Sequence, residues 1–399
     1  MPHPAKPAPA FVPMIALMMS MVALSTDIML PALPAIAADL SVAGTKDVHL
    51  VVTTLFLGFG MAQLFVGPMA DTWGRKPVVL GSFVLVIMGA VICAVAPTFE
   101  TLLLGRFIQG IGIAGPRVLA TTIVRDIYAG PTMARMMSIV MLTFIMVPIF
   151  APALGQGVQA LAGWRSIFGV LAAASLVSAI WYGVAQAETL APENQRPFTP
   201  VSLYHGLAEV IGTRASLGHT MVSGFMFGPF LAYLAGSQMI YQDIYAAGAL
   251  FPLYFALGAG SIGIAALTNS ILVERAGVVF LARRAFQIGV LGVAIFVLWS
   301  WAHDGTPPLW SFIAFVMLTF FCIGLNFGNV AALALEPMGH MAGMASAVFG
   351  FLSTMMSIPI AWVLGAVYAG TTTPLAVGFM ICGILALATF EWAVRGRAP

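Results

Sequence analysis

Three ionisable side chains lie inside otherwise apolar stretches of this sequence: Asp27, Arg106 and Arg117. A charge at membrane depth is costly, so such residues normally face a cavity or a partner. At about 1.5 Å of helix rise per residue, Asp27 and Arg106 both lie about 9 Å to the outer side of the centre of their predicted helices. Arg117 follows Arg106 by three turns on nearly the same helix face. The matched depths predict that Asp27 and Arg106 interact.

Two interpretations of this pair remain open. In the first, Asp27 exchanges protons and Arg106 adjusts its proton affinity, because burial and a neighbouring guanidinium act on a carboxyl group in opposite directions. In the second, the two residues form a permanent ion pair that only sets helix packing, although such a pair is a weak source of stability. Arg117 either attracts anionic groups or extends toward the cytoplasm.

A second charged cluster lies in the turn after the second apolar stretch, where Asp71, Arg75 and Lys76 surround Gly74. Glycine permits the positive φ of a tight turn, and the two cations suit a cytoplasmic loop. Asp71 could pair with a cation such as Arg125 or cap a helix N-terminus. The cluster is therefore either a gate that holds the inner face shut or a turn that only sets topology.

The composition restricts the class of protein. The 399 residues include only 16 Lys and Arg and 14 Asp and Glu, or 8% charged, against about 25% in soluble proteins. With 61% hydrophobic residues, the chain is predicted to be an integral membrane protein, not a soluble enzyme or a disordered chain. A net charge of +2 provides no basic surface for nucleic acid. No metal-ligand spacing, phosphate loop or nucleophile–base pair is evident, so we expect no enzyme activity and no cofactor.

Twelve apolar segments are long enough to cross a bilayer, which takes about 20 residues. They are predicted at 7–34, 48–70, 77–99, 101–124, 136–164, 166–187, 215–242, 244–273, 285–302, 305–335 and, as two segments divided near Gly370, 337–390. Of the 16 Lys and Arg residues, two lie within spans and two, Lys46 and Arg165, lie in outer loops, which leaves 12 on the inner side. This asymmetry predicts that both termini are cytoplasmic.

The longest polar connection divides the twelve segments into two sets of six. It covers residues 188–215, between a predicted N-terminal six-helix bundle of residues 1–187 and a predicted C-terminal six-helix bundle of residues 216–399. A weak repeat supports the division, because Glu274 and Gly277 follow the eighth segment as Asp71 and Gly74 follow the second. Valines stand at positions 278 and 279, where the first copy has cations. We therefore expect an all-α membrane protein with the repeated halves typical of secondary transporters.

Several motifs resemble the major facilitator superfamily. Residues 67–76 resemble its signature loop Gly-x-x-x-Asp-x-x-Gly-Arg-Lys/Arg, with matches at Gly67, Asp71, Gly74, Arg75 and Lys76. Residues 106–110 are similar to the Arg-x-x-Gln-Gly sequence of its proton-coupled drug exporters, and residues 148–157 to the Pro/Gly-rich segment of its antiporters. Segments 26–34, 124–128, 163–168 and 342–347 resemble its bicyclomycin/chloramphenicol-resistance (Bcr/CflA) subfamily of drug:proton antiporters.

The resemblance implies roles for particular residues. Asp27 would be the acidic site for protons and substrate, with Arg106 as its partner in the fourth span. A cytoplasmic gate network would be formed by Asp71, Arg75, Arg125 and Asp126. The flexible antiporter helix would be shaped by Pro148, Pro152 and Gly155. Pro116 and Arg117 depart from the family pattern and imply less cationic substrates.

Five side chains are candidates for lining a substrate cavity: Gln109, Arg117, Phe225, Tyr233 and Asn326. Gln109 belongs to the polar stripe that also holds Arg106 and Arg117. Phe225 and Tyr233 could form an aromatic wall for amphipathic ligands, or they could pack in the core or against lipid. Asn326 could line the cavity or hydrogen-bond to a neighbouring helix.

Together, the residues and the resemblance imply a proton-coupled exporter of small amphipathic drugs or toxic compounds that works by alternating access in a bacterial inner membrane. Its partners would be a small-molecule substrate and the lipid bilayer, H+ would be the coupling ion, and the family suggests a monomer. A dedicated exporter of one endogenous metabolite or siderophore-like product is the alternative. A membrane-embedded enzyme would need acidic or His residues clustered at one interface, and a passive pore would need no coupling carboxylate.

Overall fold

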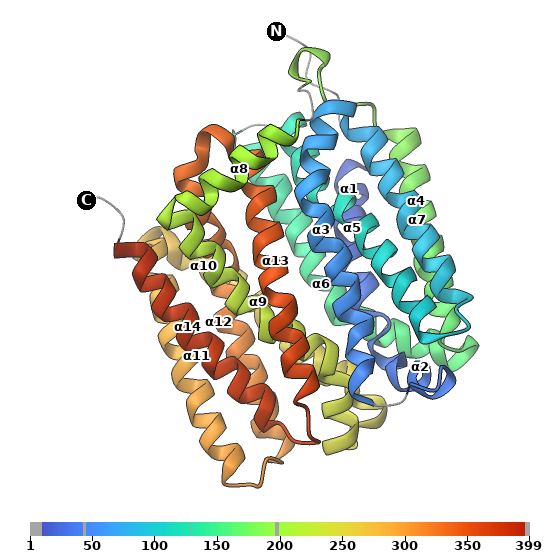
Figure 1. The fold of residues 1–399 in the computed structure, drawn as a ribbon, viewed down its shortest axis with the longest axis vertical. Helices are drawn as coiled ribbons and strands as arrows, with labels where there is room; N and C mark the ends of the chain where they lie inside the picture. The colour runs from blue at the N-terminus through green and yellow to red at the C-terminus, as the bar shows by residue number, and fades with distance from the viewer. Residues whose placement is uncertain (1–9, 43–44, 129, 196–198, 396–399) are drawn as a thin grey trace. The chain divides into compact units, whose positions relative to one another are not determined.

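A computed structural model of the chain describes residues 10–42, 45–128, 130–195 and 199–395. Within these ranges every regular element is a helix, and no strand is present (Figure 1). The long helices are α1 (Phe11–Asp27), α3 (Leu50–Trp73), α4 (Arg75–Ala94), α5 (Phe99–Ile127), α6 (Gly130–Ala162), α7 (Arg165–Ala185), α9 (Arg214–Met239), α10 (Phe251–Ala276), α11 (Val278–Trp301), α12 (Leu309–Leu335), α13 (Ala342–Ala366) and α14 (Thr373–Arg395).

Nine segments of the described chain are long and apolar enough to cross a membrane. One of them, Leu309–Ala366, contains both α12 and α13, which are separated by a short 3-10 helix at Glu336–Met341. Two further long helices lie outside the nine segments: α6, which has a shorter apolar stretch at Met146–Ala162, and α9. The long helices therefore follow the order of the predicted spans, although the predicted start at residue 7 lies outside the described residues.

Contacts divide the chain into two compact units. The first unit consists of residues 1–42 and 54–205, and the second consists of residues 43–53 and 206–399. The later division point falls inside α8 (Pro200–Gly212), within the predicted connection 188–215. The first unit holds α1, most of α3, and α4 to α7, whereas the second holds α9 to α14.

In the first unit, α4 and α5 pack closely because small residues lie at their contact. A Cβ atom on Gly89 would lie 2.5 Å from the backbone nitrogen of Gln109, and one on Gly112 would lie 2.5 Å from the backbone nitrogen of Val86. Small residues let helix backbones approach where lipid supplies no hydrophobic driving force between helices. This packing sets the position of α5, which carries Arg106.

The first span is interrupted. α1 ends at Asp27, a 3-10 turn covers Leu30–Ala32, and the short helix α2 covers Leu33–Asp39. Pro31 and Pro34 account for this break, because proline lacks the backbone N–H and its ring clashes with the preceding helical turn. The residues of the break are buried inside the protein, which irregular backbone requires at membrane depth.

In the second unit, aromatic rings fill the space between α9, α10 and α12. Tyr233 of α9 stacks on Phe255 of α10 with ring centroids 6.2 Å apart, and it meets Phe320 of α12 edge-on at 4.9 Å. Phe230 of α9 lies 5.0 Å from the same Phe320 ring. Ring pairs of this kind stabilise a core beyond the burial of their area. This aromatic cluster forms the core that holds the three helices together.

Candidate functional site

Asp27 lies at the interruption of the first span. It is the last residue of α1, and only 3% of its surface is exposed. A carboxylate is unfavourable at this end of a helix, because the helix dipole places partial negative charge there. An ionised carboxylate also loses its hydration when it is buried. Both costs fall on the ionised form alone, so the position suits a carboxyl group that exchanges a proton.

Arg106 is completely buried on α5, and its guanidinium binds neutral oxygen atoms. Its Nη1 donates to Oε1 of Gln109 at 2.6 Å, and its Nη2 donates to the carbonyl oxygen of Ser25 at 3.0 Å. The ring of Phe168 lies 5.9 Å from the guanidinium carbon. In the described part of the chain, no ion pair joins Arg106 to Asp27. Arg106 therefore contacts α1 two residues before Asp27 and does not pair with the carboxylate in this structure.

The other polar residues of α5 occupy different environments. Gln109 is fully buried, and its Nε2 has no hydrogen-bond partner among the described residues. This amide therefore offers a free donor directly beside Arg106. Arg117 is half-buried further along the same helix. The predicted polar stripe is thus buried where it meets α1 and more accessible toward its other end.

The predicted antiporter helix, α6, packs directly on the break in the first span. A methyl group on Gly155 would overlap the carbonyl oxygen of Ile28, the residue that follows Asp27. Only glycine allows this close approach. Pro152 is buried and Pro148 half-buried on the same helix. The structure therefore places Gly155 against the peptide next to Asp27.

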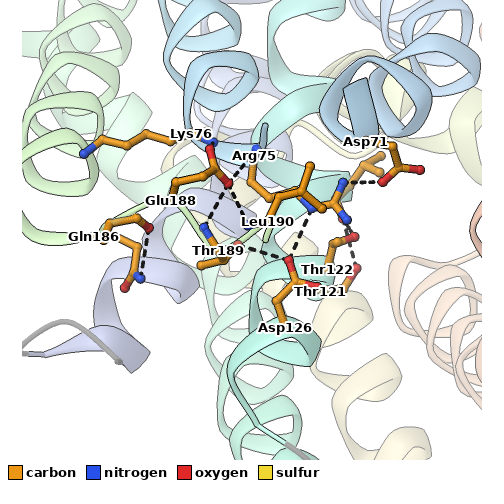
Figure 2. A network of polar contacts seen from close by, with 12 residues as sticks. Asp71, Arg75, Lys76, Thr121, Thr122, Asp126, Gln186, Glu188, Thr189 and Leu190 are labelled. Atoms are coloured by element: carbon orange, nitrogen blue, oxygen red, sulfur yellow. Dashed lines mark hydrogen bonds and ion pairs between the residues drawn. The ribbon is translucent and has the colours of Figure 1, made fainter. Parts of the chain in front are cut away.

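A network of polar contacts joins the ends of α3, α4 and α5 (Figure 2). Arg75 forms an ion pair with Asp71 one turn earlier, and its Nε donates to Oδ2 of Asp126 at 3.2 Å. The side chain of Arg75 is 9% exposed. Arg125, the fourth predicted gate residue, has an exposed side chain. The ion-pair partner of Asp71 is thus Arg75 and not Arg125.

Glu188, the third residue after α7, completes this network of polar contacts and is not among the residues predicted from the sequence. Its carboxylate accepts hydrogen bonds from the backbone N–H groups of Arg75 and Lys76, each at 2.9 Å, and so caps α4 (Figure 2). The N-terminus of a helix has unsatisfied N–H groups and partial positive charge, which a carboxylate stabilises. The next residue, Thr189, donates to Asp126 at 3.0 Å. The signal in the sequence is an isolated acidic residue directly after a span.

The corresponding turn of the second unit repeats the backbone but not the polar contacts. Gly277 has φ 79° and ψ 149°, close to the φ 99° and ψ 157° of Gly74. Each glycine directly joins two consecutive long helices. In the second unit Arg283 binds Glu391 of α14, with Nε 2.5 Å from Oε1 and Nη2 3.0 Å from Oε2. The repeat in the sequence is therefore present in the backbone geometry of both turns.

A cavity of about 50 Å³ lies inside the second unit, between α9, α11, α12 and α14. Two predicted cavity residues, Phe225 and Asn326, line it together with apolar side chains and the cysteines Cys322 and Cys382. Asn326 is 1% exposed, and its Oδ1 has no hydrogen-bond partner in the described part of the chain. The hydroxyl-bearing Thr319 also lines this mostly apolar cavity. Tyr233 belongs instead to the aromatic cluster.

The family model described as Major Facilitator Superfamily matches residues 15–361. The chain belongs to the Major Facilitator Superfamily. Members of this superfamily are membrane transporters and not enzymes, and they need no cofactor, as the sequence predicted. The all-helical fold and the order of its long helices agree with the twelve-span architecture of the superfamily.

Relatives in the superfamily align along nearly the whole chain. The uncharacterized MFS-type transporter YdgK of Bacillus subtilis is 29% identical over 374 residues, which cover 92% of this chain and 91% of YdgK. A bicyclomycin resistance protein homolog of Haemophilus influenzae is 25% identical and covers 91% of both chains. The multidrug resistance protein MdtL of Shigella flexneri is 26% identical and covers 93% of this chain and 92% of its own. The predicted kinship with bicyclomycin-resistance transporters is confirmed at this level.

Solved structures of the superfamily share the fold. The human organic anion transporter MFSD10 (TETRAN) aligns with a TM-score of 0.71 and 18% identity, covering 96% of this chain and 98% of its own. The xylose transporter XylE of E. coli, in a partially occluded inward-open conformation, aligns with a TM-score of 0.73 and 12% identity, covering 97% of both chains. At these identities the likeness establishes the fold and not the substrate.

Proposed function

We propose that this superfamily member exports small amphipathic drugs or toxic compounds in exchange for protons, by alternating access across a bacterial inner membrane. Both termini would lie in the cytoplasm, in agreement with the distribution of Lys and Arg between the loops. Relatives named for multidrug and bicyclomycin resistance support the substrate class at the family level.

The observation that carries the proposal is the position of Asp27. The carboxyl group is buried at the end of an interrupted helix, so its ionised form is costly unless water or substrate reaches it. Opening to the outer side would supply a proton, and opening to the inner side would remove it. The antiporter helix lies against the next peptide through Gly155, so a movement of α6 would change the surroundings of Asp27 directly.

Arg106 would hold α1 in register while this proton exchange occurs. Its bond to the Ser25 carbonyl and its bond to Gln109 place a fixed positive charge near the end of α1. A fixed cation favours the ionised state of a nearby carboxyl group. The nearby Nε2 of Gln109, which has no partner among the described residues, would donate to a polar atom of the substrate.

The gate network and the second-unit cavity supply the other functions that an exporter needs. In one conformation of the transport cycle, the contacts of Arg75 with Asp71 and Asp126 would keep one end of the first unit ordered. In the alternate conformation these contacts would break. The cavity lined by Phe225 and Asn326 would accommodate an apolar group with a hydrogen-bond donor. Such an environment suits neutral amphipathic molecules better than highly charged ones.

The test is transport by the purified protein in proteoliposomes with an imposed pH gradient, using ethidium as a cationic probe and chloramphenicol as a neutral probe. We expect gradient-driven movement of at least one probe by the wild type and its loss in Asp27→Asn. The matched control is Asp304→Asn, which makes the same carboxyl-to-amide change in an exposed loop residue with φ 53°. Asparagine tolerates this left-handed conformation, so the control should transport normally.

Two results would contradict the proposal. Transport by Asp27→Asn with unchanged dependence on the pH gradient would remove Asp27 from proton coupling. Movement of none of the probes by a folded wild type would exclude this substrate class and favour a dedicated exporter of one endogenous metabolite.

A further inference from the structure

We infer that Arg165, together with Trp164 and Asp39, is a positioning group that holds the break beside Asp27 in place from the far end of α2. The inference deepens the proposed proton exchange and rests on it. We refer to the three side chains Asp39, Trp164 and Arg165 as the clamp. They lie at the end of α2 and at the start of α7, which are far apart in the sequence but belong to the same unit.

The geometry of the clamp joins three segments at one carboxylate and one guanidinium. Nη1 of Arg165 forms an ion pair with Oδ2 of Asp39, and Nε1 of Trp164 donates to the same oxygen at 3.1 Å. Nη2 of Arg165 donates to the carbonyl oxygen of Ala96 at 3.1 Å. The Arg165 guanidinium also lies over the Trp164 ring, 4.2 Å from the centroid.

The clamp acts on Asp27 because α2 is short and firmly held at both ends. Only residues 28–38, which form the break and most of α2, separate Asp27 from Asp39. At the break, the Ile28 carbonyl lies against Gly155 of α6. α6 and α7 are joined by a tight turn at Gly163, whose φ is 78°. α2 is therefore attached at one end to α6 and at the other to the start of α7, and it should move with this helix pair.

The second contact of Arg165 extends the effect to Arg106. Ala96 lies in the connection between α4 and α5, close to the start of α5. α5 carries Arg106, which binds the Ser25 carbonyl on α1. The Arg165 guanidinium therefore contacts segments on both sides of the Asp27 site. These segments are α2, which follows the break, and the connection that leads into α5, which packs beside α1.

Arginine is required for this function by its shape. The planar fork directs two N–H groups at acceptors on different segments while its face stacks on tryptophan, and a lysine ammonium does neither. Asp39 and Arg165 are about half-exposed at the surface, and isolated exposed ion pairs add little stability. The contacts thus matter for position more than for overall stability.

Other charged groups near α1 must be considered in any test based on pH. The helices packed against α1 are α5, α6 and α7. Their charged residues are Glu100, Arg106, Arg117, Arg125, Asp126, Arg135 and Arg165. Of these, Arg106 has a hydrogen bond to α1. A displaced clamp should therefore change the pH response of Asp27 by changing its distance from Arg106.

The experiment measures modification of Asp27 by a hydrophobic carbodiimide, which reacts with protonated carboxyl groups, over a range of pH and with detection by mass spectrometry. Amide hydrogen exchange of residues 33–39 is measured in the same samples, and the pH profile of transport is recorded separately. The variants are Arg165→Lys, Asp39→Asn and Trp164→Phe, which removes the indole N–H and keeps an aromatic ring for the Arg165 guanidinium. The control is Arg284→Lys in the second unit, because Arg284 also lies over an aromatic ring, that of Phe280.

We expect Arg165→Lys and Asp39→Asn to accelerate exchange in α2 and to shift the midpoint of Asp27 labelling by about half a pH unit, which corresponds to about 0.7 kcal/mol. Trp164→Phe should give a smaller shift in the same direction, and Arg284→Lys should give none. Faster amide exchange in α2 with an unchanged midpoint of Asp27 labelling would mean that the clamp stabilises α2 but does not position Asp27, which would overturn the inference. Unchanged exchange would overturn the inference altogether.

The labelling does not depend on transport, so the two proposals fail separately. If the wild type moves no probe under a pH gradient but the clamp variants still shift Asp27 labelling, proton-coupled export is wrong and the positioning role stands. If the wild type transports and the variants keep its pH profile and its labelling midpoint, the positioning role is wrong and export stands.

Discussion

The turns at Gly74 and Gly277 have nearly the same backbone and very different surroundings. Both glycines have a positive φ with an extended ψ, a combination that is almost restricted to glycine. At Gly74 the carboxylate of Glu188 fills the space beside the glycine and caps α4. At Gly277 no described atom lies within 4 Å of the position of a Cβ atom.

The comparison separates two requirements that occur together in the first turn. The glycine is needed in both turns because the chain must reverse between two consecutive helices without a loop. The charged residues are needed only where other segments supply their partners, which are Asp126 at the end of α5 and Glu188 after α7. The backbone repeat is thus present in both units, whereas the contacts of Arg75 with Asp126 and Glu188 depend on segments of the first unit.

The largest expected effect comes from replacing the two glycines. Alanine should cost about 1–3 kcal/mol at either position because of backbone strain. Gly74→Ala should cost more than Gly277→Ala, since its Cβ would lie 2.5 Å from Oε2 of Glu188 and displace the cap. Thermal unfolding in detergent measures the difference, and we expect transport to fall about tenfold further for Gly74→Ala. Equal losses for the two variants would mean that the cap adds nothing to the strain.

A smaller effect is expected from removing the arginine in each unit. Arg75→Gln leaves Asp71 and Asp126 without their shared cation, and we expect a loss near the lower end of about 1–3 kcal/mol because the arginine is largely buried. Arg283→Gln breaks a pair in which both side chains are about one-third exposed, so it should cost about 1 kcal/mol or less.

Thr122 lies on α5 four residues before Asp126, close to Arg75 (Figure 2). Thiol labelling of Thr122→Cys, with the native cysteines replaced by alanine, tests whether Arg75 restricts access to this end of the first unit. Arg75→Gln should increase the labelling rate severalfold, and Arg283→Gln should leave it unchanged. If Arg283→Gln increased labelling as much, the first-unit network would have no special role in gating.

The smallest effect is expected when the second turn is given the missing cation. Val278→Arg places a guanidinium four residues after Glu274, as Arg75 follows Asp71. Glu274 is exposed, so the new local pair should change the free energy of unfolding by less than about 0.5 kcal/mol. A stabilisation of several times this value would show that the local pair, and not the contacts from distant segments, is what strengthens the first turn.

Local patterns in the sequence single out residues that the structure brings into contact. Asp71, Arg75 and Asp126 are recognisable in the sequence because the turn and the end of the fourth span have a short and specific spacing. In the structure Arg75 contacts both of the other two residues. Phe225 and Asn326 line one cavity of the second unit, whereas Tyr233 packs among aromatic rings. Helical spacing places a side chain on a face but does not specify what that face meets.

The membrane class, the order of the spans, the two glycine turns and the burial of Asp27 and Arg106 follow from the amino-acid sequence alone. These properties depend on apolar length, on residues close together in the chain and on the cost of charge in lipid. Only the tertiary structure decided that Arg106 binds the Ser25 carbonyl, that Glu188 caps α4 and that Arg165 reaches both Asp39 and Ala96. Each of these contacts joins segments separated by 69 residues or more. Their partners were therefore set by how the helices pack, because no local spacing encodes which helix ends come together.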